Sequence, residues 1–174
     1  MNTRVAVVVG NPKPRSRTRA VAEQVARAAA QAAGLGDPSV EELHVIDLAD
    51  LAGQLFDWSS TAVREQVEIL SSATLAVVAS PVYKASYTGL LKAFLDWFGQ
   101  TGLDGVTVVP VMVGGSAAHA LAVEVHLRPV LVEIGASLPS RGLFVLEQEL
   151  DQLGGTIAAW LERAAPQLAR SVRP

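Results

Sequence analysis

The chain alternates between short apolar runs, which predict β-strands, and longer stretches with helical periodicity. The first run, from Arg4 to Gly10, is rich in valine and stops at Gly-Asn-Pro, which is typical of a strand buried on both faces of a parallel sheet. Further strands are predicted at Val40 to Leu48, Ala73 to Ser80, Val106 to Val113 and Gly142 to Glu147.

Helices are predicted between and after these strands. Ser16 or Thr18 can cap the first helix, whose apolar residues recur at helical spacing until Gly34, and Ser59 or Ser60 can cap the second. The remaining helices are predicted from Tyr87 to Phe98, from Ala117 to Ile134 and from Asp151 to Arg170.

This alternation predicts an α/β fold in which helices cover both faces of a parallel sheet, because a parallel crossover needs about a dozen connecting residues. Residues 1–174 contain no repeat, low-complexity tract or linker, so a single domain is expected. Such sheets bind ligands beyond the carboxyl ends of their strands. Three loops should therefore carry the site: Gly10 to Thr18, Ser80 to Tyr87, and Gly114 to His119.

The composition excludes several classes of function. Without cysteine there is no disulfide, thiol nucleophile or thiolate metal site, and a net charge of −3 argues against whole-domain binding of nucleic acid or of an anionic membrane. No apolar run approaches the ~20 residues that span a bilayer, and the first is too short for a signal peptide, so a cytoplasmic location is predicted. The histidines lack metal-ligand spacing and no G-x-S-x-G motif is present, so neither a metal site nor a serine hydrolase is expected.

The first loop, "GNPKPRSRT", has the composition of a phosphate site at a helix N-terminus. Ser16 and Thr18 offer hydroxyls, and Arg15 or Arg17 offers charge. The loop matches neither the P-loop nor the dinucleotide fingerprint. The alternative is a solvated basic turn with an ordinary serine cap.

The other two loops suit a planar ligand. Pro81 and Val82 can form a rigid backbone edge, after which Tyr83 and Lys84 offer an aromatic face and a cation. In the third loop, Gly114 and Gly115 permit a close approach to the backbone. Alternatively, Tyr83 is a half-buried packing residue and the glycines only form a turn.

These segments resemble the NADPH-dependent FMN reductase family of flavodoxin-like proteins, and most closely the reductase components of two-component alkanesulfonate monooxygenase systems. The similarity runs from Arg4 to about Ile134. Its most specific segment is "SPVYKASYTGLLKAFLDW"; "GNPKPRSRT" is similar to the family's G-S-P-x-x-x-S-x-T phosphate loop, and "VMVGGSAAHALAVEVHLRPVL" to its Gly-Gly loop and long fourth helix. The resemblance implies a flavodoxin-like three-layer sandwich with a five-stranded parallel sheet and helices on both faces.

The resemblance also implies an FMN site. The phosphate is expected at Ser16, Arg17 and Thr18, with the backbone near Asn11 and Pro12; Asn11 stands where many members carry serine. The residues expected to border the flavin ring and ribityl chain are Pro81, Val82, Tyr83 and Lys84 on one side and Gly114, Gly115 and Ser116 on the other.

The activity that the resemblance implies is NAD(P)H:FMN oxidoreduction. Hydride passes from the reduced nicotinamide to the flavin, and no catalytic side chain is required because the cofactors carry the chemistry. A homodimer or homotetramer is expected, as is delivery of reduced FMN to a flavin-dependent monooxygenase, such as a sulfonate monooxygenase. The choice between NADPH and NADH stays open, as does whether FMN is a bound cofactor or a leaving substrate.

Two other functions fit the same fold. A reductase that retains FMN would act on quinones, azo dyes or metal oxyanions, whereas a flavodoxin-type electron carrier would not oxidise a nicotinamide. Carriers tend to be more acidic and to have a hydroxyl-rich phosphate loop, so Lys13, Arg15 and Arg17 disfavour the carrier.

Pro129 falls inside the predicted fourth helix, where it lacks an N–H donor and clashes with the carbonyl of Val125. A one-residue π-bulge near Val125 and His126 would relieve that clash, and such bulges gather at functional sites. Sulfonate-type reductases are similar in having an inserted residue there, at a tetramer interface beside the flavin, so His126 is expected to take this interface or regulatory role. The alternative is a plain proline kink with His126 in solvent.

Overall fold

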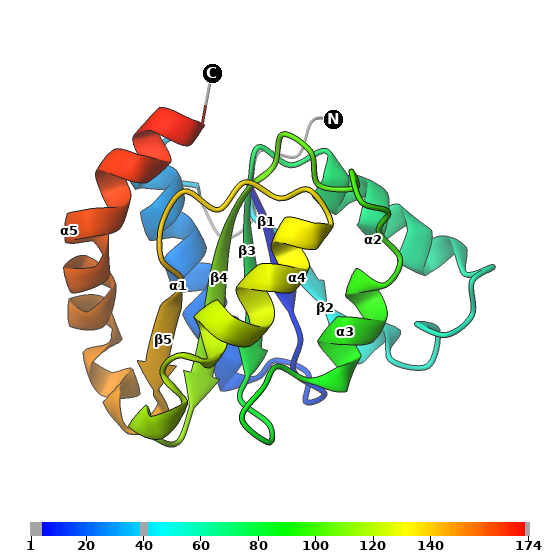
Figure 1. Cartoon of the computed structure of the whole chain (residues 1–174), viewed down its shortest axis with the longest axis horizontal. Coiled ribbons are helices and arrows are strands. Elements are labelled where there is room, and N and C mark those ends of the chain that lie inside the picture. The colour runs from blue at the N-terminus through cyan, green and yellow to red at the C-terminus, as the bar shows by residue number, and fades with distance from the viewer. Residues whose placement is uncertain (1–4, 39–41, 173–174) are drawn as a thin grey trace.

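The sheet has five parallel strands in the order β2-β1-β3-β4-β5 (Figure 1). The computed structural model describes residues 5–38 and 42–172. The strands are β1 (Val5–Val9), β2 (His44–Asp47), β3 (Leu75–Pro81), β4 (Thr107–Gly114) and β5 (Leu143–Leu146). This confirms the predicted sheet, although Arg4 and Val40, predicted to begin the first two strands, lie outside the described residues.

Helices cover both faces of the sheet. α1 (Arg17–Ala32) and α5 (Leu153–Ser171) lie on one face, and α2 (Thr61–Ser71), α3 (Gly89–Leu95) and α4 (Arg128–Glu133) lie on the other (Figure 1). Short helical segments η2 (Leu48–Leu51), η3 (Ala117–His119), η4 (Val123–Leu127) and η5 (Glu147–Gln152) connect the larger elements. The predicted flavodoxin-like three-layer sandwich is therefore confirmed, whereas a single domain over residues 1–174 stays a prediction.

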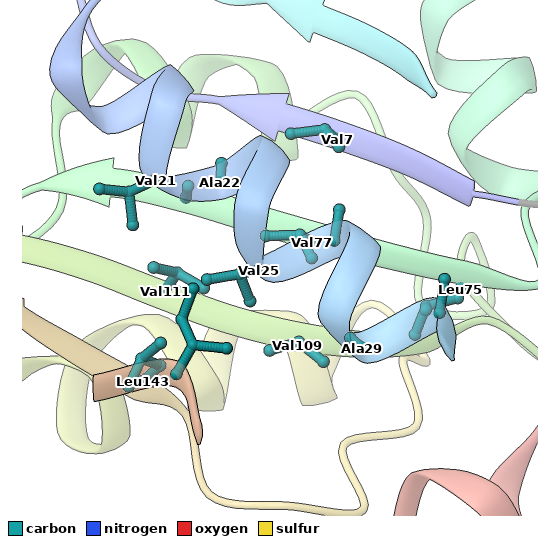
Figure 2. Close-up of a cluster of buried hydrophobic side chains, with 14 of the residues drawn as sticks. Val7, Val21, Ala22, Val25, Ala29, Leu75, Val77, Val109, Val111 and Leu143 are labelled. Carbon is teal, nitrogen blue, oxygen red and sulfur yellow. The ribbon is translucent and has the colours of Figure 1, made fainter. Parts of the chain in front are cut away.

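Alternating strand residues divide the interior into two cores. Val5, Val7 and Val9 of β1 pack on the α1 and α5 side, and Ala6 and Val8 pack on the other side. Figure 2 shows α1 lying across the strands, with Val21, Ala22, Val25 and Ala29 against valines of the sheet. Because alanine is small, this face of α1 packs closely on the sheet, which fixes the position of the helix N-terminus.

The order of the strands places a reversal point between β1 and β3. β1 pairs with β2 on one side and with β3 on the other, so the chain winds outward in opposite directions from this pair. Open α/β sheets bind their ligands outside the carboxyl ends of the strands at such a point.

Candidate functional site

The predicted loops meet at one edge of the sheet, because β1, β3 and β4 are neighbours and end on the same side (Figure 1, lower edge). A cavity of about 250 Å³ lies among them. It is lined by Asn11, Lys13, Arg15, Ser16, Arg17, Thr18, Pro81, Tyr83, Val113 and Glu147. Of the predicted cofactor residues, Pro12, Val82, Lys84, Gly114, Gly115 and Ser116 do not line this cavity.

The first loop is held in shape by its own side chains. Ser16 is the N-cap of α1, and its hydroxyl oxygen accepts a hydrogen bond from the Arg19 N–H at 3.3 Å. Asn11 Nδ2 donates to Thr18 Oγ1 at 3.0 Å, and Asn11 Oδ1 accepts from the Lys13 N–H at 2.9 Å. Of the two predicted caps, Ser16 is thus the one used, and Thr18 is buried within α1. The cavity opens at a helix N-terminus, which favours an anion.

Asp47, at the end of β2, fixes the middle of the same loop. Its side chain is 2% exposed and accepts from the Arg15 N–H at 3.1 Å, with Arg19 Nη1 3.5 Å away. A hydrogen bond to Glu23, and the charges of Glu23 and Asp47, raise the pKa of the Arg19 guanidinium above its ordinary value. Asp47 is not among the site residues predicted from the sequence; its only signal there is an acidic side chain near the end of the predicted second strand.

Charge in the cavity is mainly positive. Lys13, Arg15 and Arg17 come from the first loop and the start of α1, and all three line the cavity. Glu147, directly after β5, is also part of the lining, with its Oε2 atom 3.3 Å from Arg17 Nη2. Glu147 is not among the predicted site residues, although it was predicted to end the fifth strand and so to lie at the same edge of the sheet.

The β3–α3 loop contains a tight turn. The N–H of Tyr83 donates to the carbonyl of Ser86 at 2.8 Å, and the N–H of Ser86 donates to the carbonyl of Tyr83 at 3.1 Å. Between them, Lys84 and Ala85 have φ of 51° and 63°, a left-handed conformation that favours glycine or asparagine. Tyr83 is 50% exposed and lines the cavity, so both its flavin role and the half-buried packing role stay predictions.

Relieving the strain at Ala85 should stabilise the protein. Ala85→Gly should raise the free energy of unfolding by about 0.5–1 kcal/mol, because the left-handed penalty exceeds the entropy that glycine adds to the unfolded chain. Ala28→Gly, inside α1, is the matched control and should lower it by about 1 kcal/mol. Urea unfolding followed by circular dichroism measures both, and a destabilised Ala85→Gly variant would contradict this account of the turn.

At the end of β4, Gly114 packs closely against the side chains of Phe144 and Val82. A Cβ atom on Gly114 would lie 2.9 Å from the Phe144 ring and 3.1 Å from Val82 Cγ2, so only glycine fits there without a shift. A Cβ on Gly115 would meet nothing within 4 Å, which leaves open space beside the loop that follows β4. Ser116 caps η3, its hydroxyl accepting from the Ala118 N–H at 3.3 Å. The Val82 N–H bonds the Val113 carbonyl at 2.8 Å and ties this loop to the preceding one.

The predicted helix from Ala117 to Ile134 is not continuous. η4 is π-helical, and the Arg128 N–H donates to the carbonyl of Val123, five residues earlier. This confirms the bulge predicted from Pro129, which lies in the first turn of α4, and it corrects both the unbroken helix and the plain proline kink. His126 is exposed, so its interface or regulatory role stays a prediction.

Residues 5–38 and 42–172 contain no group of three or more His, Cys, Asp or Glu side chains that could hold a metal ion. No helix among them has the length and apolar character needed to cross a membrane.

Comparisons with known proteins identify the family. The chain is 34% identical over 161 residues to NADH-dependent FMN reductase SfnF of Pseudomonas putida, covering 87% of this chain and 83% of that protein. It is 36% identical over 149 residues to FMN reductase (NADPH) of Escherichia coli strain K12, covering 84% of this chain and 75% of that protein. The solved structure of the NADH:FMN oxidoreductase EMOB in its apo form superposes with a TM-score of 0.73 at 33% identity, over 92% of this chain and 90% of that one. A model of the NADPH-dependent FMN reductase family matches residues 3–151, and the chain therefore belongs to that family.

Proposed function

We propose that this protein is an NAD(P)H-dependent FMN reductase whose flavin site is the edge formed by the β1, β3 and β4 loops. The observation that carries the assignment of the site is the cation-lined cavity at the N-terminus of α1, beside the reversal point of the sheet. A phosphate is the ligand group that this combination of helix terminus, hydroxyls and cations favours.

The cavity would hold the phosphate end of FMN. Ser16 and Thr18 each use an oxygen lone pair within the loop, so their hydroxyl hydrogens are free to be donated to a phosphate. Arg15 and Arg17 supply charge, while Asn11 acts through the loop by holding Thr18 and the Lys13 backbone. At about 250 Å³ the cavity is below the roughly 300–1,000 Å³ of pockets for drug-sized ligands, which suits part of FMN rather than all of it.

The ring would lie outside this cavity, along the β3 and β4 loops. Pro81, Val82, Tyr83 and Lys84 would border one side, and Gly114, Gly115 and Ser116 the other. The half-exposed Tyr83 and the open space at Gly115 support a ring that a nicotinamide can reach. Bound FMN supplies the hydride-accepting chemistry, and the protein supplies orientation and charge.

The same proposal includes a homo-oligomer and a partner enzyme that receives the reduced FMN. Exposed apolar side chains at Leu121, Val125 and Val132, with exposures of 60%, 56% and 56%, support a contact with a second copy of the chain along η4 and α4. Reduced FMN would then pass to a partner flavin-dependent monooxygenase, in a cytoplasmic setting. Dimer and tetramer remain alternatives, and both NADH and NADPH appear in the names of the relatives.

Steady-state kinetics tests the activity. Oxidation of NADH and NADPH should be slow alone and should rise with added FMN, and comparison with FAD and riboflavin shows which flavin is preferred. Absence of stimulation by any added flavin would contradict a leaving flavin. Yellow colour that survives purification, with a quinone as the better acceptor, would instead support a reductase that retains FMN.

A further inference from the structure

Arg17 and Glu147 form an ion pair in the lining of the cavity at the N-terminus of α1. Arg17 is the first residue of α1 and Glu147 the first of η5, so two elements 130 residues apart in sequence meet here. Arg17 Nη2 lies 3.3 Å from Glu147 Oε2, and the side chains are 69% and 41% exposed. Both also line a second cavity of about 370 Å³, between α1 and η5, so the pair stands between the two cavities.

Glu147 has the wrong charge for a phosphate site. Among the described residues that line the smaller cavity it is the one carboxylate, beside Lys13, Arg15 and Arg17. A phosphate that engages Arg17 must compete with Glu147 for the same guanidinium, and it also meets the repulsion of a like charge. Both effects oppose binding of the anion, and both disappear when Glu147 is made neutral.

We propose that Glu147 is a counter-charge that weakens the binding of phosphate-bearing flavins and so favours release of the reduced product. This inference rests on the proposed function. Arg17 pairs with Glu147, and the phosphate of a bound FMN would take Arg17 and leave the carboxylate to water, which its 41% exposure permits. The penalty is therefore moderate, and it applies to FMN but not to riboflavin, which lacks the phosphate.

Flavin titrations of Glu147→Gln test the proposal. The dissociation constant for FMN, measured by quenching of flavin fluorescence at low ionic strength, should fall about three- to fivefold, which is the upper part of the range expected for an exposed charge pair. The constant for riboflavin should stay within about twofold. The effect on FMN should shrink at 0.5 M salt, where the Debye length is below about 8 Å.

Glu149→Gln is the matched control. It removes the same charge from the same short helix, but Glu149 lines neither cavity, so its effect on FMN should be within about twofold. The counter-charge role would be overturned if Glu147→Gln left FMN affinity unchanged or lowered it. It would also be overturned if Glu147→Gln raised riboflavin affinity as much as FMN affinity, or if Glu149→Gln raised FMN affinity equally. A wild-type protein that bound neither flavin would refute the proposed function itself.

Discussion

Replacing Gly10 with alanine should lower the free energy of unfolding by about 1–3 kcal/mol and weaken FMN binding, because the added methyl group has no room. A Cβ atom at Gly10 would lie 2.7 Å from Leu91 Cβ and 3.3 Å from the Ala79 carbonyl oxygen. The Leu91 Cβ is fixed to the backbone of α3, so the helix or the end of β1 must move. Since Gly10 begins the phosphate loop, that movement displaces the loop as well.

Gly89→Ala is the matched control for this prediction. Gly89 is the exposed first residue of the same helix, and a Cβ atom there would meet nothing within 4 Å. The free energy of unfolding of the Gly89→Ala variant should stay within about 0.5 kcal/mol of wild type or rise slightly. Urea unfolding and FMN titration measure both variants. A Gly10→Ala protein as stable as Gly89→Ala would show that the contact with Leu91 does not constrain the site.

The sheet and its site edge were predictable because they follow from local patterns and one topological rule. Buried parallel strands are short apolar runs, and the carboxyl ends of parallel strands lie at the same edge of the sheet, so the loops after β1, β3 and β4 were expected at that edge. Their meeting follows from the observed strand order, in which β1, β3 and β4 are neighbours. The observed cavity lining includes Ser16, Arg17, Thr18, Pro81 and Tyr83 from these loops, together with Asn11, which the family resemblance implied. The bulge at η4 was predictable for a similar reason, because proline has no N–H to donate within a helix wherever it occurs in the sequence.

Pairings that depend on tertiary packing were not predictable. Asp47 reaches Arg15 across 32 residues and Glu147 reaches Arg17 across 130, and no spacing rule joins them. Helix ends were also misjudged: the helix expected from Tyr87 to Phe98 runs only from Gly89 to Leu95. Thr88 caps it at the start, and after Leu95 the N–H groups of Trp97 and Phe98 bond to carbonyls three residues earlier instead of four. The apolar pattern continued through Phe98 because that residue is buried, not because it is helical.

Thr88 is the residue that joins the two principal loops of the site, and its removal should have the largest effect on stability. Its buried hydroxyl donates to the Gly10 carbonyl at 2.6 Å and accepts from the Leu91 N–H at 3.1 Å, while its own N–H donates to Ser80 Oγ at 3.1 Å. Thr88→Val removes the helix cap and leaves the buried Gly10 carbonyl without its donor. We expect a loss of about 2–4 kcal/mol in the free energy of unfolding, the sum of a lost cap and an unsatisfied buried carbonyl.

Thr88→Ser separates the hydroxyl from the shape of the side chain. Serine keeps both hydrogen bonds and loses only one methyl group, so it should cost about 1 kcal/mol and leave FMN affinity near that of wild type. Thr88→Val keeps the shape but should weaken FMN binding as well as stability, because the ends of the β1 and β3 loops are no longer tied together. If valine were tolerated as well as serine in both urea unfolding and FMN titration, packing alone would hold the two loops in register, and the hydroxyl at position 88 would have no part in shaping the flavin site.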